Sequence, residues 1–452
     1  MRRFRVTDWI HRNARLLVAL FFFEVAMVAI GLPDPVQIVI VCGYNGFQSV
    51  RELTADAVAR FHHRNPSGPP PDMRVVAAAN DLGFSLLRRL SDAAPGRNVF
   101  FSPYNVAASM TICANASNGA TRAAVLKTLR LTPADLAASN TAQESLGEYL
   151  SATDPRIQVK TATSLWADSA VDLNPAFTGQ MRKDLKADVE SADLHSAAGM
   201  ARLTAWIARN SDAQLASGIP PMAPEEHIAI VNTLSFHGRW KDQFKRSDTR
   251  PGPFHLEGGT TKQLPMMSRR GSVRGFDGEY GKSERRYLVA SLPYGDGSMG
   301  MLIIVPAFDR AARVADILPL ITAKQVDTWM SHLRSFDGGI EMPRFRVRCR
   351  PEMDPVLRQS GLAPAYDASR ADFSSMAKAR SGQNIYLGRT VETAFLEVDE
   401  EGTRAASMRV MVFNTFGKPR KIVVDRPFIC LIRDNRTGMI LFAGAIYDPS
   451  AL

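Results

Sequence analysis

The sequence has little cysteine: four residues in a chain of 452, at positions far apart. No two of them form a CxxC pair, and none is spaced from a histidine as metal ligands are, so neither a disulfide framework nor a zinc site is predicted. Cys113 and Cys430 have apolar neighbours, where a free cysteine packs as a small hydrophobic side chain. We expect these thiols to be buried, and we expect no bound metal. The four residues are Cys42, Cys113, Cys349 and Cys430.

Enzyme signatures are also missing. The sequence has no GxSxG, no HExxH and no glycine-rich dinucleotide turn after a strand. Gly281-Lys282-Ser283 resembles the end of a phosphate-binding loop, but Phe276 occupies the position where that loop needs glycine. The pair His62-His63 has no third ligand near it. Because no nucleophile with a base is indicated, we expect a protein that is not an enzyme and needs no cofactor.

Charge and composition describe an ordinary folded protein. Hydrophobic residues make up 45% and charged residues 22% of the chain, which excludes wholesale disorder. The net charge is +10, yet the basic residues lie in small scattered groups and form no long stripe. Such groups usually face water, so nucleic acid is not an expected partner.

Residues 1–72 differ in character from the rest. A basic start leads into an apolar stretch over residues 16–32, interrupted by Glu24, which has the layout of a signal peptide or a signal-anchor helix. The alternative is an upstream extension without a structural role. Residues 62–72 are rich in proline and polar residues and are typical of a linker, which places a domain boundary near Met73. We expect residues 73–452 to form one domain. A signal would place it outside the cell or in the envelope, and otherwise it is cytoplasmic.

Helical patterns come early in this domain and strands come late. Apolar residues at helical spacing predict helices over residues 75–90 and 106–129. Short β-branched runs predict strands at residues 228–236, 287–292, 299–305, 345–347 and 421–428. Without a regular βαβ alternation, this order favours an α+β fold with mostly antiparallel sheets.

Five ordered blocks of the sequence resemble the serpin family of serine protease inhibitors, and together they span almost all of residues 75–450. The blocks are Asn98-Val99-Phe100-Phe101-Ser102-Pro103 with the helical stretch through Thr121; Val231 to Trp240 with Phe244, Thr249 and Phe254; Met266-Met267 with Leu292-Pro293-Tyr294 and Val305-Pro306; Met342 to Phe345 with Gly361-Leu362 and Ala371 to Ser374; and Phe395 to Thr403 with Arg426-Pro427-Phe428 and Leu441 to Gly444.

The resemblance implies the serpin fold: helices packed on large, mostly antiparallel sheets, with an exposed reactive-centre loop. Its hinge is carried over to Glu400, Glu401, Gly402, Thr403, Ala405, Ala406 and Ser407. A loop that inserts into a sheet has to place alternate side chains on a covered face, where small residues are tolerated and charges are costly. Thr403, Ala405 and Ser407 share the inward phase, and Ala406 is on the other face. Arg409 has the inward phase too and departs from the pattern.

Family spacing places the bait bond between Phe416 and Gly417. Phe416 lies fourteen residues after Gly402 and eleven before Pro427, so the two counts agree. A large aromatic residue before the cut suits the apolar pocket of chymotrypsin-like or subtilisin-like proteases.

The resemblance also assigns Ser102, Asn232 and Glu392 to the cluster that holds the main serpin sheet closed. Glu392 occupies the position of the family's histidine, and we expect it to accept a hydrogen bond from the amide of Asn232. The resulting hypothesis is a monomeric inhibitor that traps its target protease by loop insertion. The alternative is a non-inhibitory serpin that acts as a binding or chaperone module. Polyanion binding is not expected, because the helical region after Thr121 has few basic residues.

Overall fold

The computed structural model describes residues 66, 68–152, 154–212, 215, 219–280, 285–307, 313–402 and 421–450. Its contacts divide the chain into two units, Met1–Ala57 and Val58–Leu452, and the described residues belong to the second. The expected signal segment and Cys42 lie outside the described residues. So do seven loop residues singled out above: Thr403, Ala405, Ala406, Ser407, Arg409, Phe416 and Gly417.

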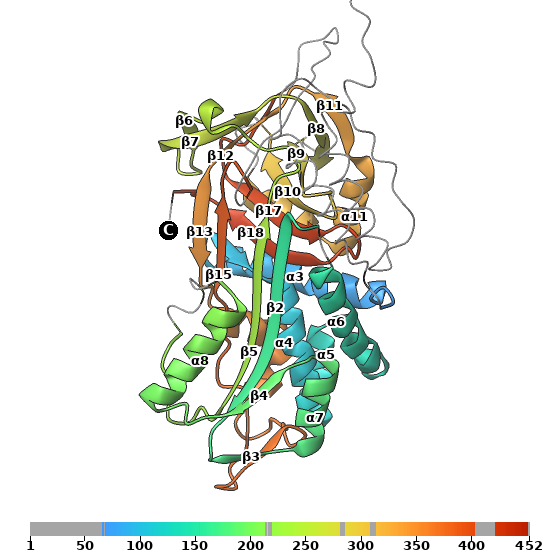
Figure 1. Ribbon diagram of the computed structural model, residues 1–452, viewed down its shortest axis with the longest axis vertical. Coiled ribbons are helices and arrows are strands. Elements are labelled where there is room, and N and C mark those ends of the chain that lie inside the picture. The colour runs from blue at the N-terminus through green and yellow to red at the C-terminus, as the bar shows by residue number, and fades with distance from the viewer. Residues whose placement is uncertain are drawn as a thin grey trace, which may run out of the picture. The chain divides into compact units, whose positions relative to one another are not determined.

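Helices dominate the first half of the described chain (Figure 1). Their bounds are α3 Met73–Ala93, α4 Pro103–Ala116, α5 Gly119–Thr128, α6 Leu136–Ser151, α7 Pro175–Asp184, α8 Ala197–Asn210, α10 Val314–Ile317, α11 Ala323–His332 and α12 Met353–Leu357. The predicted helix over residues 75–90 is confirmed as α3, whose N-terminus is capped by the side chain of Asp72. No helix in these described ranges is both long and apolar enough to cross a bilayer.

The predicted helix over residues 106–129 is two helices. The helix is interrupted at Ser117 and Asn118, which lie between α4 and α5. The hydroxyl of Ser117 donates to the carbonyl of Cys113, and Gly119 has a φ of +50°. A polar side chain bonded back to the last turn ends a helix that apolar spacing alone would continue.

The strands form a seven-stranded sheet, a four-stranded sheet and three smaller ones. The largest has the order β1 Val99–Phe101, β18 Ile440–Ile446, β17 Phe428–Asp434, β10 Met299–Pro306, β9 Arg285–Tyr294, β8 Ser272–Tyr280 and β11 Arg334–Asp337. The four-stranded sheet has the order β16 Ile422–Val423, β12 Ile340–Pro343, β7 Thr261–Arg269 and β6 Arg250–His255. The smaller sheets are β4 Asp188–Ser191 with β2 Ile157–Ala167 and β5 Ile228–Gly238; β13 Phe345–Cys349 with β15 Ala394–Val398; and β14 Ala377–Ala379 with β3 Val171–Leu173.

All pairs in the seven-stranded sheet are antiparallel, as the α+β prediction requires. The strand runs predicted at residues 228–236, 287–292, 299–305 and 345–347 are confirmed within two residues at each end. The run at residues 421–428 is split between β16 and β17, with Pro427 before the second strand. Proline lacks the N–H that a continuous ladder needs.

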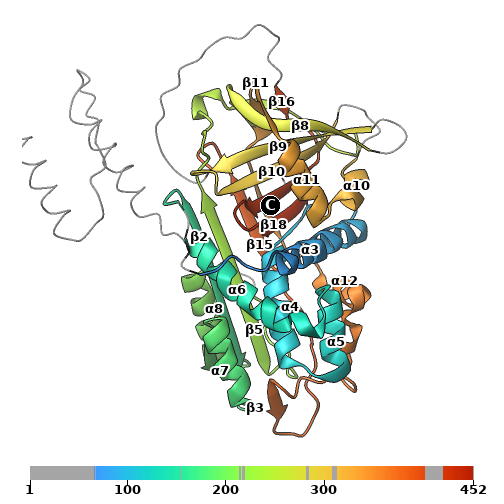
Figure 2. The ribbon, with the colours of Figure 1, turned by 90° about the vertical axis from the view of Figure 1, so that its right-hand side faces the viewer.

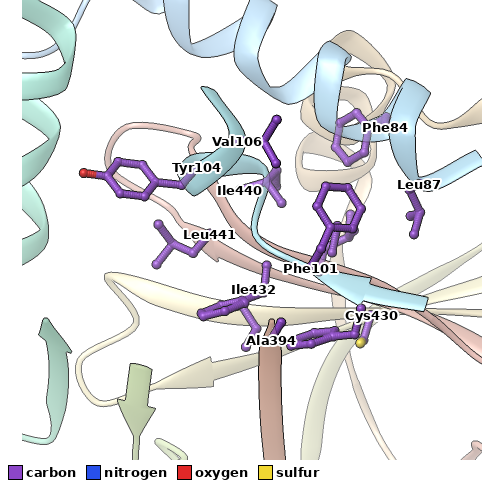
Figure 3. Close-up of a cluster of buried hydrophobic side chains, with 14 of the residues drawn as sticks. Phe84, Leu87, Phe101, Tyr104, Val106, Ala394, Cys430, Ile432, Ile440 and Leu441 are labelled. Carbon is purple, nitrogen blue, oxygen red and sulfur yellow. The ribbon is translucent and has the colours of Figure 1, made fainter. Parts of the chain in front are cut away.

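A continuous apolar core joins the early helices to the late strands (Figure 3). Phe84 and Leu87 of α3 approach Phe101 of β1, while Ile440 and Leu441 come from β18. α3 and α4 both lie against β18, and α4 also lies against β5 (Figure 2). Three of the four cysteines are described, and all three are buried and free: Cys113, Cys349 and Cys430. The predicted burial of Cys113 and Cys430 is confirmed.

Candidate functional site

The segment Asp399 to Gly402, which follows β15, is bound to the chain that follows β5. The N–H of Trp240 donates to the carbonyl of Glu401 at 3.2 Å, and the N–H of Phe244 donates to the carbonyl of Glu400 at 2.9 Å. The indole N–H of Trp240 donates to the carbonyl of Asp399 at 2.9 Å. These bonds tie the end of β15 to the end of β5. From here on, the hinge means Asp399 to Gly402, which includes the described part of the hinge expected from the family.

Side chains of the hinge add polar contacts. Glu400 is buried, accepts from the hydroxyl of Thr249 at 2.7 Å and lies 3.6 Å from a guanidinium nitrogen of Arg344. Glu401 accepts from Arg246 at 2.9 Å. Burial, with help from the neighbouring carboxylates, raises the pKa of Asp399. Arg344 and Thr249 together leave the buried carboxylate of Glu400 with a charge partner and a hydrogen-bond donor, which its burial requires.

Gly402 is the last residue of the hinge segment Asp399 to Gly402. Its φ is +86°, in the left-handed region that favours glycine. A Cβ at this position would overlap the carbonyl of Gly238 and the N–H of Trp240. The docked hinge therefore accepts no larger residue at position 402.

Gly402→Ala is expected to lower the free energy of unfolding by about 2 kcal/mol, because it combines backbone strain with overlap of backbone atoms. Gly382→Ala is the matched control: its φ is +75°, but a Cβ there has no neighbour within 4 Å. The control should cost about 1 kcal/mol. Both are measured by denaturant unfolding. Equal losses in the two variants would mean that the hinge is not docked as described.

A gap separates β5 from β15. Within the described residues β5 pairs with β2 and β15 pairs with β13, and no ladder joins β5 to β15. A cavity of about 60 Å³ lies between these two strands, with room for a few water molecules. Its lining comes from β5 (Leu234, Ser235, Phe236, His237), β15 (Phe395, Leu396, Glu397), the segment after α8 (Asp212, Leu215), the hinge (Gly402) and the underlying sheet (Tyr294, Ile432, Phe442).

The expected hydrogen bond between Glu392 and Asn232 is absent from the described residues, and each finds other partners. Glu392 accepts from the backbone N–H of Ser102 at 3.1 Å. The amide of Asn232 donates to the hydroxyl of Ser109 at 2.8 Å and accepts from Thr163 at 2.7 Å. The register places Thr163 directly opposite Asn232. Removing the Glu392 carboxyl would therefore deprive Ser102 of an acceptor and leave the Asn232 amide paired.

α4 supports both parts of this cluster. Ser102 caps the helix by accepting from the N–H of Asn105, and Ser109 follows seven residues later on the same helical face. Burial raises the pKa of Glu392 to about 7, while the N–H of Ser102 opposes the shift. This carboxyl therefore changes charge near neutral pH.

A family model described as Serpin (serine protease inhibitor) matches residues 77–449. The chain is a serpin. Leukocyte elastase inhibitor A of Rattus norvegicus is 27% identical to it over 390 residues, which cover 83% of this serpin and 100% of the relative. Among solved structures, native protease nexin-1 with heparin has a TM-score of 0.75 at 21% identity and covers 83% of this serpin and 100% of that chain. Thyroxine-binding globulin in complex with thyroxine has a TM-score of 0.73 at 21% identity, covering 84% and 100%.

These likenesses confirm the serpin family and its α+β fold. At 21% identity, the likeness to these solved structures shows the fold alone. One of these structures contains heparin and the other thyroxine, and the rat relative is named an elastase inhibitor. Membership in the family therefore leaves the activity of this serpin to be argued from its own site.

Sequence reasoning missed the residues that hold the hinge of this serpin. Trp240 and Thr249 were part of a family block, but nothing local connects them to Glu400 or Glu401. Arg344 precedes β13 and reaches Glu400 across more than fifty residues of chain. The available signal was the acidic pair Glu400-Glu401 directly after a predicted apolar segment, since a carboxylate that becomes buried, as Glu400 is, requires donors from elsewhere in the fold.

Proposed function

We propose that this serpin inhibits chymotrypsin-like or subtilisin-like serine proteases as a suicide substrate. The bait bond joins Phe416 to Gly417. The protease's serine oxygen attacks the carbonyl carbon of Phe416, an ester to Phe416 forms, and the amine of Gly417 leaves with a proton from the protease's histidine. Residues 403–416 then enter the gap between β5 and β15 as a new strand and carry the acylated protease along.

The observation that carries this function is the gap itself. In the described part of the chain, β5 pairs with β2 and β15 pairs with β13. An entering strand therefore does not have to break a ladder between β5 and β15. Unpaired strand edges accept a further strand readily, and serpin loop insertion is a known example of such addition. The hydrogen bonds of the hinge to Trp240 and Phe244 are the described contacts that entry would break first.

Chain direction also favours insertion. β5 runs toward Gly238, and β15 runs toward Gly402, which lies beside Gly238. Both strands thus run the same way, and a segment that reverses after Gly402 would be antiparallel to both. Antiparallel pairing on two sides supplies every backbone group of the new strand with a partner.

The floor of the gap determines which side chains can enter. Ile432 and Phe442 line it with apolar side chains, and Tyr294 adds an aromatic ring. Small side chains at alternate positions fit such a floor. An unpaired charge there costs several kcal/mol, which is enough to prevent the strand from inserting. Thr403, Ala405 and Ser407 meet this requirement by sequence.

The serpin should form an adduct with chymotrypsin that survives denaturing electrophoresis, with the cut after Phe416 located by mass spectrometry. Phe416→Lys is the matched variant: it should lose the chymotrypsin adduct and form one with trypsin, because the residue before the cut fills the specificity pocket. If only cleaved monomer forms, without a gain in thermal stability, insertion does not occur. A non-inhibitory binding or chaperone module is then the correct assignment.

The partner is the target protease, and a monomer is sufficient for this mechanism. Catalysis belongs to the protease, so the serpin itself acts without enzymatic activity or cofactor. The basic and apolar layout of residues 1–32 supports export to the protease's compartment.

A further inference from the structure

Two histidines and one aspartate meet at the end of the β2–β5 pair, away from the hinge. Asp168 follows the last residue of β2, and His227 precedes the first residue of β5. Because Ala167 pairs with Ile228, the two side chains belong to neighbouring positions across the ladder. The N–H of Asp168 donates to the carbonyl of His227 at 3.1 Å, which holds the two backbones together.

His195 reaches the same point from the turn between β4 and α8. β4 pairs in parallel with β2, and the N–H of Ala192 continues this contact by donating to the carbonyl of Ala167 at 3.0 Å. The turn is tight, since a Cβ on Gly199 would overlap the carbonyl of Asp193. The N–H of His195 donates to the carboxylate of Asp193 at 3.0 Å, which fixes its backbone.

The side-chain atoms lie at distances close to those of a metal site. Oδ2 of Asp168 is 3.4 Å from Nε2 of His195 and 2.8 Å from Nδ1 of His227. The three candidate ligand atoms all lie within 4.8 Å of one another. Around a tetrahedral zinc with bonds of about 2.0–2.1 Å, ligand atoms are separated by roughly 3.3 Å. The two distances from Asp168 are within about half an ångström of that separation, and the two imidazole nitrogens lie within 4.8 Å of each other.

Charge and access also suit a cation. The side chain of Asp168 is 7% exposed, whereas those of His195 and His227 are 32% and 34% exposed, so the carboxylate is covered and the imidazoles are open to solvent. In the described part of the chain, both ion-pair partners of Asp168 are histidines, which carry charge only when protonated. A divalent cation would neutralise the covered carboxylate at a pH where the imidazoles are neutral.

We propose that Asp168, His195 and His227 bind a zinc-like divalent cation, with water in the fourth position. Two imidazoles and one carboxylate form a ligand set typical of zinc sites with an open position. The bound ion would connect the end of β2, the start of β5 and the turn before α8, since Asp168, His195 and His227 are separated by 27 and 32 positions in the sequence. Since α8 packs on β2 through Trp166, Leu203 and Trp206, the ion stabilises that helix on the sheet.

The test is titration of the full chain with zinc chloride by calorimetry, in a His62→Gln/His63→Gln background that removes the histidine pair of the linker sequence. We expect one zinc per chain, and a thermal midpoint raised by about 4 °C in excess zinc. His195→Gln and His227→Gln should each weaken binding by about tenfold or more. His237→Gln is the matched control, since His237 lies at the other end of β5 and 3.7 Å from Asp212, without a third ligand in the described cluster. It should bind zinc as the parent does.

Cobalt(II) provides a measurement that does not depend on the variants folding. The parent protein should develop the visible absorption of a tetrahedral cobalt site, and zinc should displace it. Absence of zinc binding, or equal binding by the parent and both site variants, would overturn the proposal in favour of a hydrogen-bonded cluster without metal. Neither outcome bears on protease trapping, because adduct formation is measured separately in the absence of metal.

Discussion

Thr403→Arg is expected to convert the serpin from an inhibitor of chymotrypsin into a substrate. Position 403 has the inward phase of the entering strand, and its side chain would meet the apolar floor formed by Tyr294, Ile432 and Phe442. An unpaired guanidinium there costs several kcal/mol, on the order of tenfold to a thousandfold in the rate of insertion. Hydrolysis of the acyl-enzyme then finishes before the protease is trapped. Denaturing electrophoresis should show cleaved monomer in place of the adduct, with the cut still after Phe416.

Ala406→Arg is the matched control, because it introduces the same charge in the opposite phase. It should retain the adduct, as the arginine already present at position 404 has that phase too. Arg409→Thr tests the same rule in reverse: it removes a charge of the inward phase and should raise the fraction of encounters that end in adduct. If arginine at positions 403 and 406 had equal effects, side-chain phase would not govern insertion.

Glu392→Gln should abolish a pH dependence of stability that the parent shows between about pH 4.5 and 7. Burial raises the pKa of Glu392 from 4.5 in the unfolded chain to about 7 in the fold. Across this window the folded state binds the proton more tightly than the unfolded state, so the contribution of Glu392 to stability falls as pH rises and is lost once the pH passes the folded pKa of about 7. The total loss corresponds to about 3 kcal/mol. Glutamine still accepts from the N–H of Ser102 but does not ionise.

The measurement is the unfolding midpoint of both proteins at pH 5 and pH 8. The parent should lose stability between the two values, and the variant should lose about 2.5 kcal/mol less, because pH 5 already lies above the pKa of the unfolded carboxyl. Glu225→Gln, which replaces an exposed glutamate, is the control and should keep the profile of the parent. A Glu392→Gln profile that matches the parent would contradict the assigned burial of this carboxyl. The N–H of Ser102 donates more strongly to the ionised carboxylate, so the loss of stability comes from burial of the charge and not from this hydrogen bond.

Much of the fold could be predicted from the hydrophobic pattern of each segment together with the family resemblance. The apolar spacing between residues 75 and 90 has the period of a helix, so α3 could be placed without any tertiary contact. β5 and β10 were recognisable as short β-branched runs for the same reason. Phase along a strand also follows from sequence, since side chains alternate every second residue. This is why the roles of Thr403 and Arg409 are testable predictions without a described loop.

Tertiary structure decided which groups meet. Asn232 pairs with Thr163 and Ser109 because the β2–β5 register and the packing of α4 place them together, and no local pattern reports a register across 69 residues. The sequence predicted no metal site because Asp168, His195 and His227 lack the spacing of a ligand motif. The end of β2, the start of β5 and the turn after β4 bring these three residues together in the fold. Hydrophobic periodicity indicates whether each segment is a helix or a strand. The partners of a side chain, in contrast, depend on how the folded segments pack against one another. The gap beside β5, the docked hinge and the histidine cluster therefore became visible only in the folded chain.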